Sequence, residues 1–358
     1  MKIGILNLPF DNNYGGNLQR YALVKVLQNM GHDVECIFMY PQYRLPWYKI
    51  PYSYPKRYIK KILGKSSMPI RLEKMCALNA EKGNKLALQF YNKYIPHTAK
   101  ITTMKELKRI ADGRYDAFIV GSDQVWRADM TKQLKTENYF FDFLGESSTK
   151  RIAYAVSLGT DVPYEKSLVK KLTPLYKRFA SVTVREYSAL DLFKSYGWQM
   201  PKAQWVLDPT MLLPQEHYKS LIESAQTTNY TEGKIFCYIL DKNGNTQKII
   251  DDKKKNWGLE CYEMGLQNSI TVSIEQWLRN VMQSKFVITD SFHGVVFSIL
   301  FNRPFIFVGN KKRGNARIES LYKMFDIVKD KTETIQWKQT NILLEQWRER
   351  SFNILINI

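Results

Sequence analysis

Short apolar runs alternate with segments of helical periodicity along most of this chain, and few architectures accommodate that order. In the first forty residues an apolar run at 2–7 is followed by a turn-forming stretch, a helical pattern from Leu18 and a second apolar run at 34–38. This strand–helix–strand order predicts a parallel β-sheet. It also places the loop after the first strand at the carboxyl edge of the sheet, where α/β proteins bind ligands.

The alternation falls into two sets, which predicts two domains. Strand-like runs recur at 117–120, 151–156, 181–184 and 206–210, and a second set begins near residue 234. A chain of 358 residues is also longer than one ordinary domain of about 150 residues. We therefore expect an α/β fold of two Rossmann-like domains, 1–207 and 208–335, whose parallel sheets face a central cleft. A final helix at 336–358 is expected to pack back on the N-terminal domain.

The chain is strongly basic. It has 53 Lys and Arg residues against 34 Asp and Glu residues, which gives a net charge of +19 at pH 7. Such an excess favours a polyanionic partner or an anionic surface. Because the sequence contains no RNA-recognition, zinc-finger or basic-zipper pattern, we expect no nucleic acid among its partners.

The segment 41–75 concentrates this charge. It contains nine Lys or Arg residues, six aromatic residues and five prolines, but only one acidic residue, Glu73. The composition predicts an insertion in the first domain, formed by a loop and a basic helix. One interpretation is a peripheral contact with an anionic membrane surface. The other is a solvated segment that packs on its own domain.

The sequence contains no recognisable targeting or metal-binding pattern. The apolar run at the N-terminus is too short for a signal peptide, and no stretch approaches the ~20 apolar residues of a membrane span. The four cysteines have no metal-ligand spacing, and no HExxH or acidic calcium-binding pattern occurs. These observations predict a cytoplasmic protein that uses no metal ion and no cofactor.

A Gly-Ser-Asp-Gln-Val-Trp-Arg motif at 121–127 directly follows an apolar strand. It brings a carboxylate (Asp123), an amide (Gln124) and a flat aromatic side chain (Trp126) to the carboxyl end of that strand. Such side chains recognise sugar hydroxyls and sugar rings. The alternative is that Asp123 only caps a following helix.

A second motif, Thr-Asp-Ser-Phe-His-Gly at 289–294, also joins a strand to a helix. Of the four histidines, only His293 lies where the end of a strand meets a helix N-terminus. A neutral imidazole at such a place can move a proton near pH 7. A structural histidine is the alternative.

Three weaker signals accompany these motifs. The loop at 11–17, with Gly16 and Asn17, leads into a helix whose N-terminus could bind an anion or could simply follow a tight turn. Arg185 and Glu186 end a strand, where arginine offers a fork for carboxylate or phosphate and a surface ion pair is the alternative. Cations at 311–317 precede a helix and indicate either an anion site or a solvated loop.

Taken in order, these motifs resemble the polysaccharide pyruvyl transferase family. The matching stretches are Tyr-Gly-Gly-Asn-Leu-Gln-Arg-Tyr-Ala at 14–22, Gly-Ser-Asp-Gln-Val-Trp at 121–126, Val-Arg-Glu at 184–186, Asp-Pro-Thr at 208–210 and Asp-Ser-Phe-His-Gly at 290–294. The similarity extends from about residue 3 to about residue 330. It implies a GT-B-like pair of Rossmann domains.

The resemblance also implies an activity: transfer of pyruvate from phosphoenolpyruvate onto a hexose, as a ketal, in the synthesis of a bacterial capsule or exopolysaccharide. The saccharide acceptor is then expected to be lipid-linked, and the basic segment 41–75 to rest on the inner face of the membrane that carries it. His293 matches the acid/base residue of the family, and Arg185 matches an arginine that faces the donor. Many members have arginine two residues before the histidine, where this chain has Ser291. The donor clamp is therefore expected to draw on other cations, namely Arg317, Arg313 or Lys311.

This chemistry requires a proton shuttle, a carboxylate near the sugar hydroxyls and cations around the donor. We accordingly expect His293 and Asp123 to be catalytic. The expected donor-binding residues are Arg185, Arg317, Arg313, Lys311 and Ser291, and the expected acceptor-binding residues are Gln124, Trp126, Glu186, Asn17 and Gly16. Two alternatives are a GT-B glycosyltransferase that uses a nucleotide-activated sugar and a non-catalytic carbohydrate-binding protein on the same scaffold.

Overall fold

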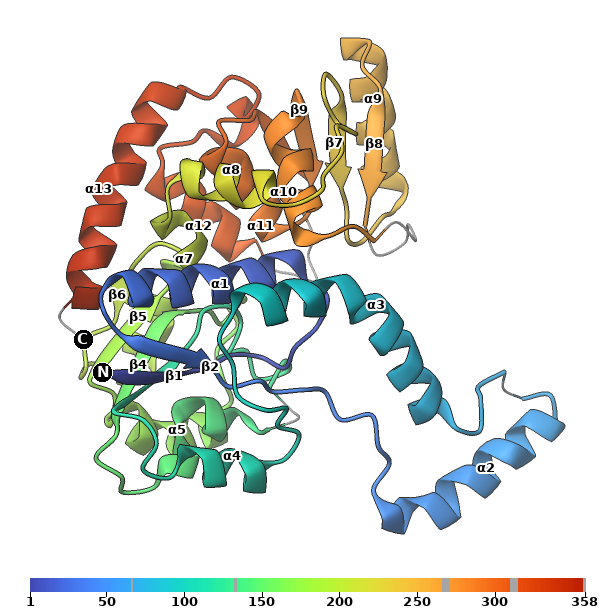
Figure 1. The fold of residues 1–358 in the computed structure, drawn as a ribbon, viewed down its shortest axis with the longest axis vertical. Coiled ribbons are helices and arrows are strands. Elements are labelled where there is room, and N and C mark those ends of the chain that lie inside the picture. Colours follow the sequence, from blue (N-terminus) through green and yellow to red (C-terminus); the bar gives the residue numbers. More distant parts are fainter. Residues whose placement is uncertain (66, 132–133, 266–270, 310–314, 357–358) are drawn as a thin grey trace.

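The computed structural model describes residues 1–65, 67–131, 134–265, 271–309 and 315–356. Within these ranges the strands form two fully parallel sheets (Figure 1). The first has the order β2-β1-β3-β4-β5-β6, with β1 at Lys2–Leu6, β2 at Asp33–Cys36, β3 at Ala117–Val120, β4 at Lys150–Val156, β5 at Ser181–Val184 and β6 at Gln204–Trp205. The second has the order β10-β9-β7-β8, with β7 at Ile235–Tyr238, β8 at Cys261–Met264, β9 at Phe286–Thr289 and β10 at Phe305–Phe307. The predicted α/β architecture with two parallel sheets is thus confirmed.

Helices connect and cover these strands. In the first half they are α1 (Tyr14–Asn29), α2 (Ile50–Ile62), α3 (Leu72–Tyr94), α4 (Met104–Ala111), α5 (Lys166–Tyr176) and α6 (Ser188–Ser195). The remaining ones are α7 (Pro209–Leu212), α8 (Gln215–Glu223), α9 (Gly244–Trp257), α10 (Ile274–Gln283), α11 (Phe292–Leu300), α12 (Ala316–Met324) and α13 (Trp337–Ile356). Single 3₁₀ turns lie at Trp47–Lys49, Thr136–Phe140, Asp142–Leu144 and Lys329–Lys331. Within the described ranges, none of these helices has both the length and the apolar character needed to cross a bilayer.

The strands are apolar because the sheets are covered on both faces. Every residue of β3 is fully buried, as are the central residues of β4. This pattern is typical of parallel sheets, whose crossover helices lie on either side. The core of the first half includes a cluster of aromatic rings around Trp126, which stacks on Phe140 with ring centroids 4.2 Å apart.

Helix α1 lies between the two sheets and contacts both halves of the molecule (Figure 1). Its first residue, Tyr14, stacks on Trp277 of α10 with ring centroids 5.6 Å apart, and its hydroxyl donates to the carbonyl of Val272 at 3.1 Å. Farther along α1, the hydroxyl of Tyr21 lies 2.6 Å from Nε2 of His217. These contacts hold the amino end of α1 against the second half.

The last helix, α13, returns to the edge of the first sheet. The ring of Trp347 lies 4.7 Å from that of Trp205 in β6, and Ser351 Oγ accepts a hydrogen bond from the backbone of Leu207 at 3.1 Å. The buried guanidinium of Arg348 donates to the carbonyls of Met211 and Leu213. Helix α13 therefore braces the connection between the two halves.

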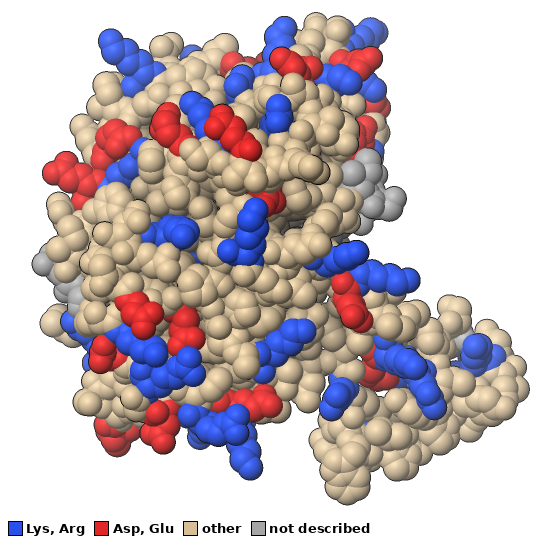
Figure 2. All heavy atoms as spheres, viewed as in Figure 1, with Lys and Arg blue, Asp and Glu red and all other residues tan. Residues whose placement is uncertain are grey.

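The segment 41–75 projects from the body (Figures 1 and 2). It contains the predicted loop and the basic helix α2, and it rejoins the body through α3. No residue of α2 is buried. The segment leaves the first sheet after β2, so it is attached at the carboxyl edge of that sheet.

Candidate functional site

His293 is the second residue of α11 and follows the carboxyl end of β9. Its ring is buried and lies against Gly15, in the first turn of α1. A Cβ atom at Gly15 would lie only 2.0 Å from Nδ1 of His293, so any larger residue there would displace the imidazole. Ser291 is the N-cap of α11, where its hydroxyl accepts a hydrogen bond from the Gly294 amide at 3.4 Å. The histidine is thus fixed where the two halves meet.

Asp208 connects the histidine to the first half. One carboxylate oxygen, Oδ1, accepts hydrogen bonds from the amide and hydroxyl of Thr210 at 3.0 and 2.6 Å. The other, Oδ2, lies 2.8 Å from Arg185 and 3.8 Å from Nε2 of His293. Burial alone would raise the pKa of Asp208, but His293 and Arg185 outweigh it and hold the pKa far below 3.8. Asp208 is therefore a buried, ionised carboxylate that lies beside the imidazole.

Arg185 lies between two carboxylates. Besides its contact with Asp208, its guanidinium is 3.2 Å from Oδ1 of Asp123 and 4.4 Å from the ring centroid of Phe292. Burial would lower the pKa of Arg185, but Asp208 and Asp123 raise it overall. Both terminal nitrogens are thus already engaged within the protein. This arrangement differs from the surface ion pair that the sequence left open, because the side chain of Arg185 is only 1% exposed.

The carboxylate of Asp123 reaches the same cluster from the loop after β3. Its side chain is 18% exposed. The backbone of Asp123 has a φ of 79°, and its carbonyl accepts a hydrogen bond from the amide of Ser157 at 2.9 Å. Burial would raise the pKa of Asp123, but Arg185, His293 and Arg317 lower it overall. Residues 124–131 form turns instead of a helix, so Asp123 is not a helix cap.

Arg317, in the first turn of α12, adds a second guanidinium beside Phe292, at 5.2 Å from the ring centroid. One turn further along this helix, Ser320 Oγ accepts a hydrogen bond from the Tyr187 amide at 2.9 Å, which docks α12 onto the first half. Burial and the charge of Arg185 lower the pKa of Arg317 to about 10. The buried guanidinium of Arg185 and the half-buried one of Arg317 lie on one ring and repel each other, and an anion between them would relieve that repulsion. The predicted cations Lys311 and Arg313 lie outside the described residues.

Glu186 and Gln124 lie beside this cluster and face the loop 157–159. Oε1 of Glu186 accepts hydrogen bonds from Ser157 Oγ and from the amides of Leu158 and Gly159, at 3.0, 2.6 and 3.0 Å. A Cβ atom at Gly159 would lie 2.0 Å from Nε2 of Gln124, so the amide group is packed tightly on this loop. Both side chains are buried, and they position the loop next to Asp123.

Four buried polar atoms of these residues have no hydrogen-bond partner within the described part of the chain. They are Nε2 of His293, Nε of Arg185, Oε2 of Glu186 and Nε2 of Gln124. Native proteins leave few buried polar atoms unsatisfied, and such atoms gather where a ligand or water completes the site. Their proximity to the Arg185–Arg317 pair marks this junction as the candidate active site.

Three predicted acceptor-binding residues have structural roles instead. Trp126 is completely buried, and its Nε1 donates to the carbonyl of Tyr139 at 3.0 Å, so the indole has no face for a sugar. The amide of Asn17 donates to the carbonyls of Asp11 and Asn13 at 3.0 Å. The amide of Gly16 donates to the Asn13 side chain, the N-cap of α1. These expectations are corrected because the tight turn and the core use the groups that a ligand would need.

Asp208, Gly15 and Phe292 belong to the cluster although no role was predicted for them. Asp208 stands in the Asp-Pro-Thr motif, directly after the last strand of the first sheet, and this position was the available signal. The roles of Gly15 and Phe292 depend on contacts between segments far apart in the chain. No local pattern distinguishes them from an ordinary turn glycine and a core aromatic residue.

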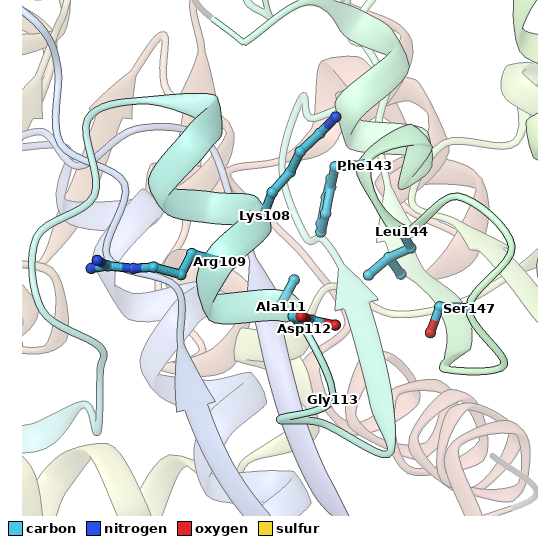
Figure 3. Close-up of a pocket in the computed structure, with 8 residues that line it drawn as sticks. All are labelled: Lys108, Arg109, Ala111, Asp112, Gly113, Phe143, Leu144 and Ser147. Carbon is cyan, nitrogen blue, oxygen red and sulfur yellow. The ribbon is translucent and has the colours of Figure 1, made fainter.

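A pocket of about 400 Å³ lies elsewhere, between the end of α4 and the segment that precedes β4 (Figure 3). Its lining is formed by Lys108, Arg109, Ala111, Asp112, Gly113, Phe143, Leu144 and Ser147. These residues precede β3 and β4, so the pocket is at the amino edge of the first sheet, opposite the edge that carries Asp123. Ligands of parallel α/β sheets bind at the carboxyl edge, which favours the His293 cluster.

Comparison with solved structures identifies the architecture as GT-B-like. UDP-GlcNAc 2-epimerase from Methanocaldococcus jannaschii has a TM-score of 0.51 at 9% identity, with 100% of both chains covered. The putative UDP-N-acetylglucosamine 2-epimerase from Listeria monocytogenes has a TM-score of 0.50 at 10% identity, with 99% of this chain and 91% of that chain covered. UDP-N-acetylglucosamine 2-epimerase from Rickettsia bellii has a TM-score of 0.50 at 7% identity, with 100% of this chain and 97% of that chain covered. At these identities the likeness concerns the fold alone.

No curated protein matches this sequence. The family model described as Polysaccharide pyruvyl transferase, however, matches residues 13–312. That range includes His293, Asp208, Arg185 and Asp123, and it covers most of both sheets. With its GT-B-like fold and this cluster of residues, the chain belongs to the polysaccharide pyruvyl transferase family.

Proposed function

We propose that this protein transfers pyruvate from phosphoenolpyruvate onto a hexose of a surface-polysaccharide precursor and forms a cyclic ketal. The observation that supports this most directly is the pair of guanidinium groups on the ring of Phe292, from the buried Arg185 and the half-buried Arg317, next to His293. Phosphoenolpyruvate carries a carboxylate and a phosphate on the same carbon, and two guanidinium groups suit such a compact polyanion. No metal ion or cofactor is required by the proposed route, and the reaction would take place in the cytoplasm.

In the proposed reaction, protonated His293 gives its proton to the methylene carbon of phosphoenolpyruvate. The neighbouring carbon then becomes an oxocarbenium-like centre, and a first sugar hydroxyl adds to it and loses its proton. Phosphate leaves as the carbon–oxygen bond to it breaks, and a second hydroxyl adds to close the ring. The two hydroxyl protons balance the new methyl hydrogen and the hydrogen phosphate that is released.

The neighbouring groups suit these steps. Asp208 lies 3.8 Å from Nε2 of His293, where its negative charge stabilises the protonated imidazole that starts the reaction. Asp123 is ionised and partly exposed, so it can accept a hydrogen bond from a sugar hydroxyl. We assign donor binding to Arg317, Arg185 and Ser291, and acceptor contacts to Gln124 and Glu186, whose buried polar atoms still lack partners.

The test is phosphate release from phosphoenolpyruvate by the wild-type protein and by His293→Ala, with a panel of galactosides, glucosides and N-acetylated hexosides. Release that needs both a sugar and His293 is the expected result, and the preferred sugar identifies the acceptor. If no acceptor supports release, while a nucleotide protects the protein against thermal unfolding and phosphoenolpyruvate does not, the proposal is wrong. A glycosyltransferase that uses a nucleotide-activated sugar would then replace it.

A further inference from the structure

The projecting segment 41–75, here called the arm, has a defined structure. Arg57 in α2 forms a bidentate ion pair with Glu73 in α3, at 2.8 and 2.7 Å, and donates to the carbonyl of Ile70 at 3.1 Å. These bonds fix α2 onto the start of α3, and α3 in turn contacts α1 and α10 of the body. Helix α2 is thus held away from the body in a fixed orientation (Figure 1).

One face of α2 is apolar and exposed to solvent. Residues at spacings of three and four share a helix face, and on α2 this face comprises Pro51, Pro55, Tyr58, Ile59 and Ile62. The side chain of Ile62 is 66% exposed, and Trp47 in the preceding turn is 81% exposed. A soluble domain rarely leaves several large apolar side chains together in water unless something covers them.

Basic residues border this face. Lys56 lies on one side of it and Lys61 on the other, whereas Lys60 lies on the back of the helix, and all three are exposed. The arm contains nine cationic residues in total, and its single acid, Glu73, is already paired with Arg57. A helix with an apolar face bordered by lysines is typical of segments that lie in the interface of an anionic membrane. Figure 2 shows the arm as a separate lobe in which uncharged surface adjoins clusters of Lys and Arg.

We propose that the arm is a membrane-surface anchor: α2 lies parallel to an anionic phospholipid bilayer, with its Pro51–Ile62 face in the headgroup region and its lysines on the phosphates. The positive charge of the arm favours an anionic bilayer over other partners. A second copy of the chain would bring an equally cationic arm against the first, and the two would repel. A nucleic acid would satisfy the lysines but would leave the apolar face in water. An anionic bilayer satisfies both.

The place of attachment relates the anchor to the candidate active site. The arm leaves the first sheet at the carboxyl end of β2, the edge that also carries Asp123. Where α3 rejoins the body, Gly83 lies next to Asn12, just before the N-cap of α1, and α1 holds His293 through Gly15. A saccharide carried on a membrane lipid would therefore approach the site from the side of the arm. This last step rests on the proposed function, whereas the membrane binding itself does not.

The test is flotation of the full-length protein with vesicles of phosphatidylcholine alone and with vesicles that contain about 30% phosphatidylglycerol, an anionic lipid that gives the surface a negative potential. We expect at least about tenfold stronger binding to the anionic vesicles, because each cation near such a surface contributes about fivefold in affinity. High salt should weaken this binding. Equal binding to both vesicles, or binding to neither, would overturn the proposal.

Two variants separate the apolar and the electrostatic contributions. Ile59→Ser with Ile62→Ser leaves the charge unchanged, and Lys56→Gln with Lys60→Gln and Lys61→Gln leaves the apolar face unchanged. Each should reduce binding to anionic vesicles at least about tenfold. The matched controls are Val162→Ser with Met200→Ser, both exposed on the body, and Lys166→Gln with Lys170→Gln and Lys171→Gln on α5. These should bind like the wild-type protein.

A reduction that is equal in controls and arm variants would overturn the proposal, as would unchanged binding of the Ile59/Ile62 variant. An unfolding temperature equal to that of the wild-type protein verifies that each variant is folded. An arm-dependent dimer in size-exclusion chromatography, without vesicle binding, would assign the face to a second copy instead. Flotation requires no turnover, so this result is independent of whether phosphoenolpyruvate is the donor.

Discussion

Nε2 of His293 lies 3.8 Å from Oδ2 of Asp208, and this pair joins the two halves of the molecule at the candidate active site. Asp208 follows β6, the last strand of the first sheet, whereas His293 lies in the first turn of α11, which follows β9 of the second sheet. The carboxylate is completely buried, so its charge acts on the imidazole with little screening by water. The proton chemistry that we propose thus depends on the docking of one half on the other.

Replacement of His293 tests the proton transfer. We expect His293→Ala to lower kcat by about 10²–10⁴-fold, the usual contribution of a general acid or base. The thermal unfolding temperature should change little in comparison. His32→Ala, near the N-terminus and outside the cluster, is the control and should keep wild-type turnover. Wild-type phosphate release by His293→Ala would rule out the assigned role.

Replacement of Asp208 tests how the imidazole is held. Asp208→Asn keeps the size of the side chain but removes the negative charge that faces Nε2 of His293 and the guanidinium of Arg185. We expect kcat for phosphate release to fall at least about tenfold, because a misplaced reacting group costs up to about 10²-fold, while KM for phosphoenolpyruvate changes little. Wild-type kcat in Asp208→Asn would rule out the role of Asp208 in holding the imidazole.

The same aspartates make stability depend on pH. The folded-state pKa values of Asp208 and Asp123 are both below 3.8. The stability that they contribute is therefore present above the unfolded-state pKa of about 4 and is lost as pH falls below it. The free energy of unfolding, measured with urea between pH 7 and pH 2.5, should show this loss in the wild-type protein and a smaller loss in Asp208→Asn. If the free energy falls equally with pH in the two proteins, the prediction is wrong.

The contact between Gly15 and His293 gives a matched pair of substitutions in one helix turn. A Cβ at Gly15 would lie 2.0 Å from the imidazole, whereas a Cβ at Gly16 would meet Asn13 at an ordinary 3.4 Å. We expect Gly15→Ala to reduce kcat at least about tenfold by displacing the ring (a misplacement of 1 Å costs up to about 10²-fold). Gly16→Ala should be nearly neutral. Equal activities of the two variants would disprove the positioning role of Gly15.

Arg317 tests the donor site. Arg317→Gln removes one of the two cations beside Phe292, and we expect KM for phosphoenolpyruvate to rise about 10–100-fold, as for the loss of a hydrogen bond to a charged group. Arg350→Gln, exposed on α13, is the control for loss of an arginine charge. Arg185 is less suitable for this test, since its removal would break the buried ion pairs with Asp123 and Asp208 and cost about 3–5 kcal/mol of stability. An unchanged KM in Arg317→Gln would exclude a donor contact.

Much of the architecture follows from local pattern. Apolar runs such as 117–120 form strands of a sheet that is covered on both faces, and this arrangement buries every side chain of the run. The polar motifs at 121–127 and 289–294 are found at the carboxyl edges because each directly follows such a strand. The sequence likewise indicated the basic arm, because nine cations and one acid cannot pack into a core.

The site itself was decided by the tertiary structure. Trp126 belongs to a motif typical of sugar recognition, but its side chain is buried against Phe140. The packing of the whole aromatic cluster determines the direction in which this loop side chain points. Asp208 and His293 are 85 residues apart in the numbering and meet only when α1 and α11 are docked. The groups that packing brings together then set the charges: Arg185 and His293 keep the buried carboxylates ionised, and burial lowers the pKa of Arg317 to about 10. Sequence alone therefore determined which chemical groups stand at the strand ends, and long-range packing, which no local pattern encodes, decided which of them act together.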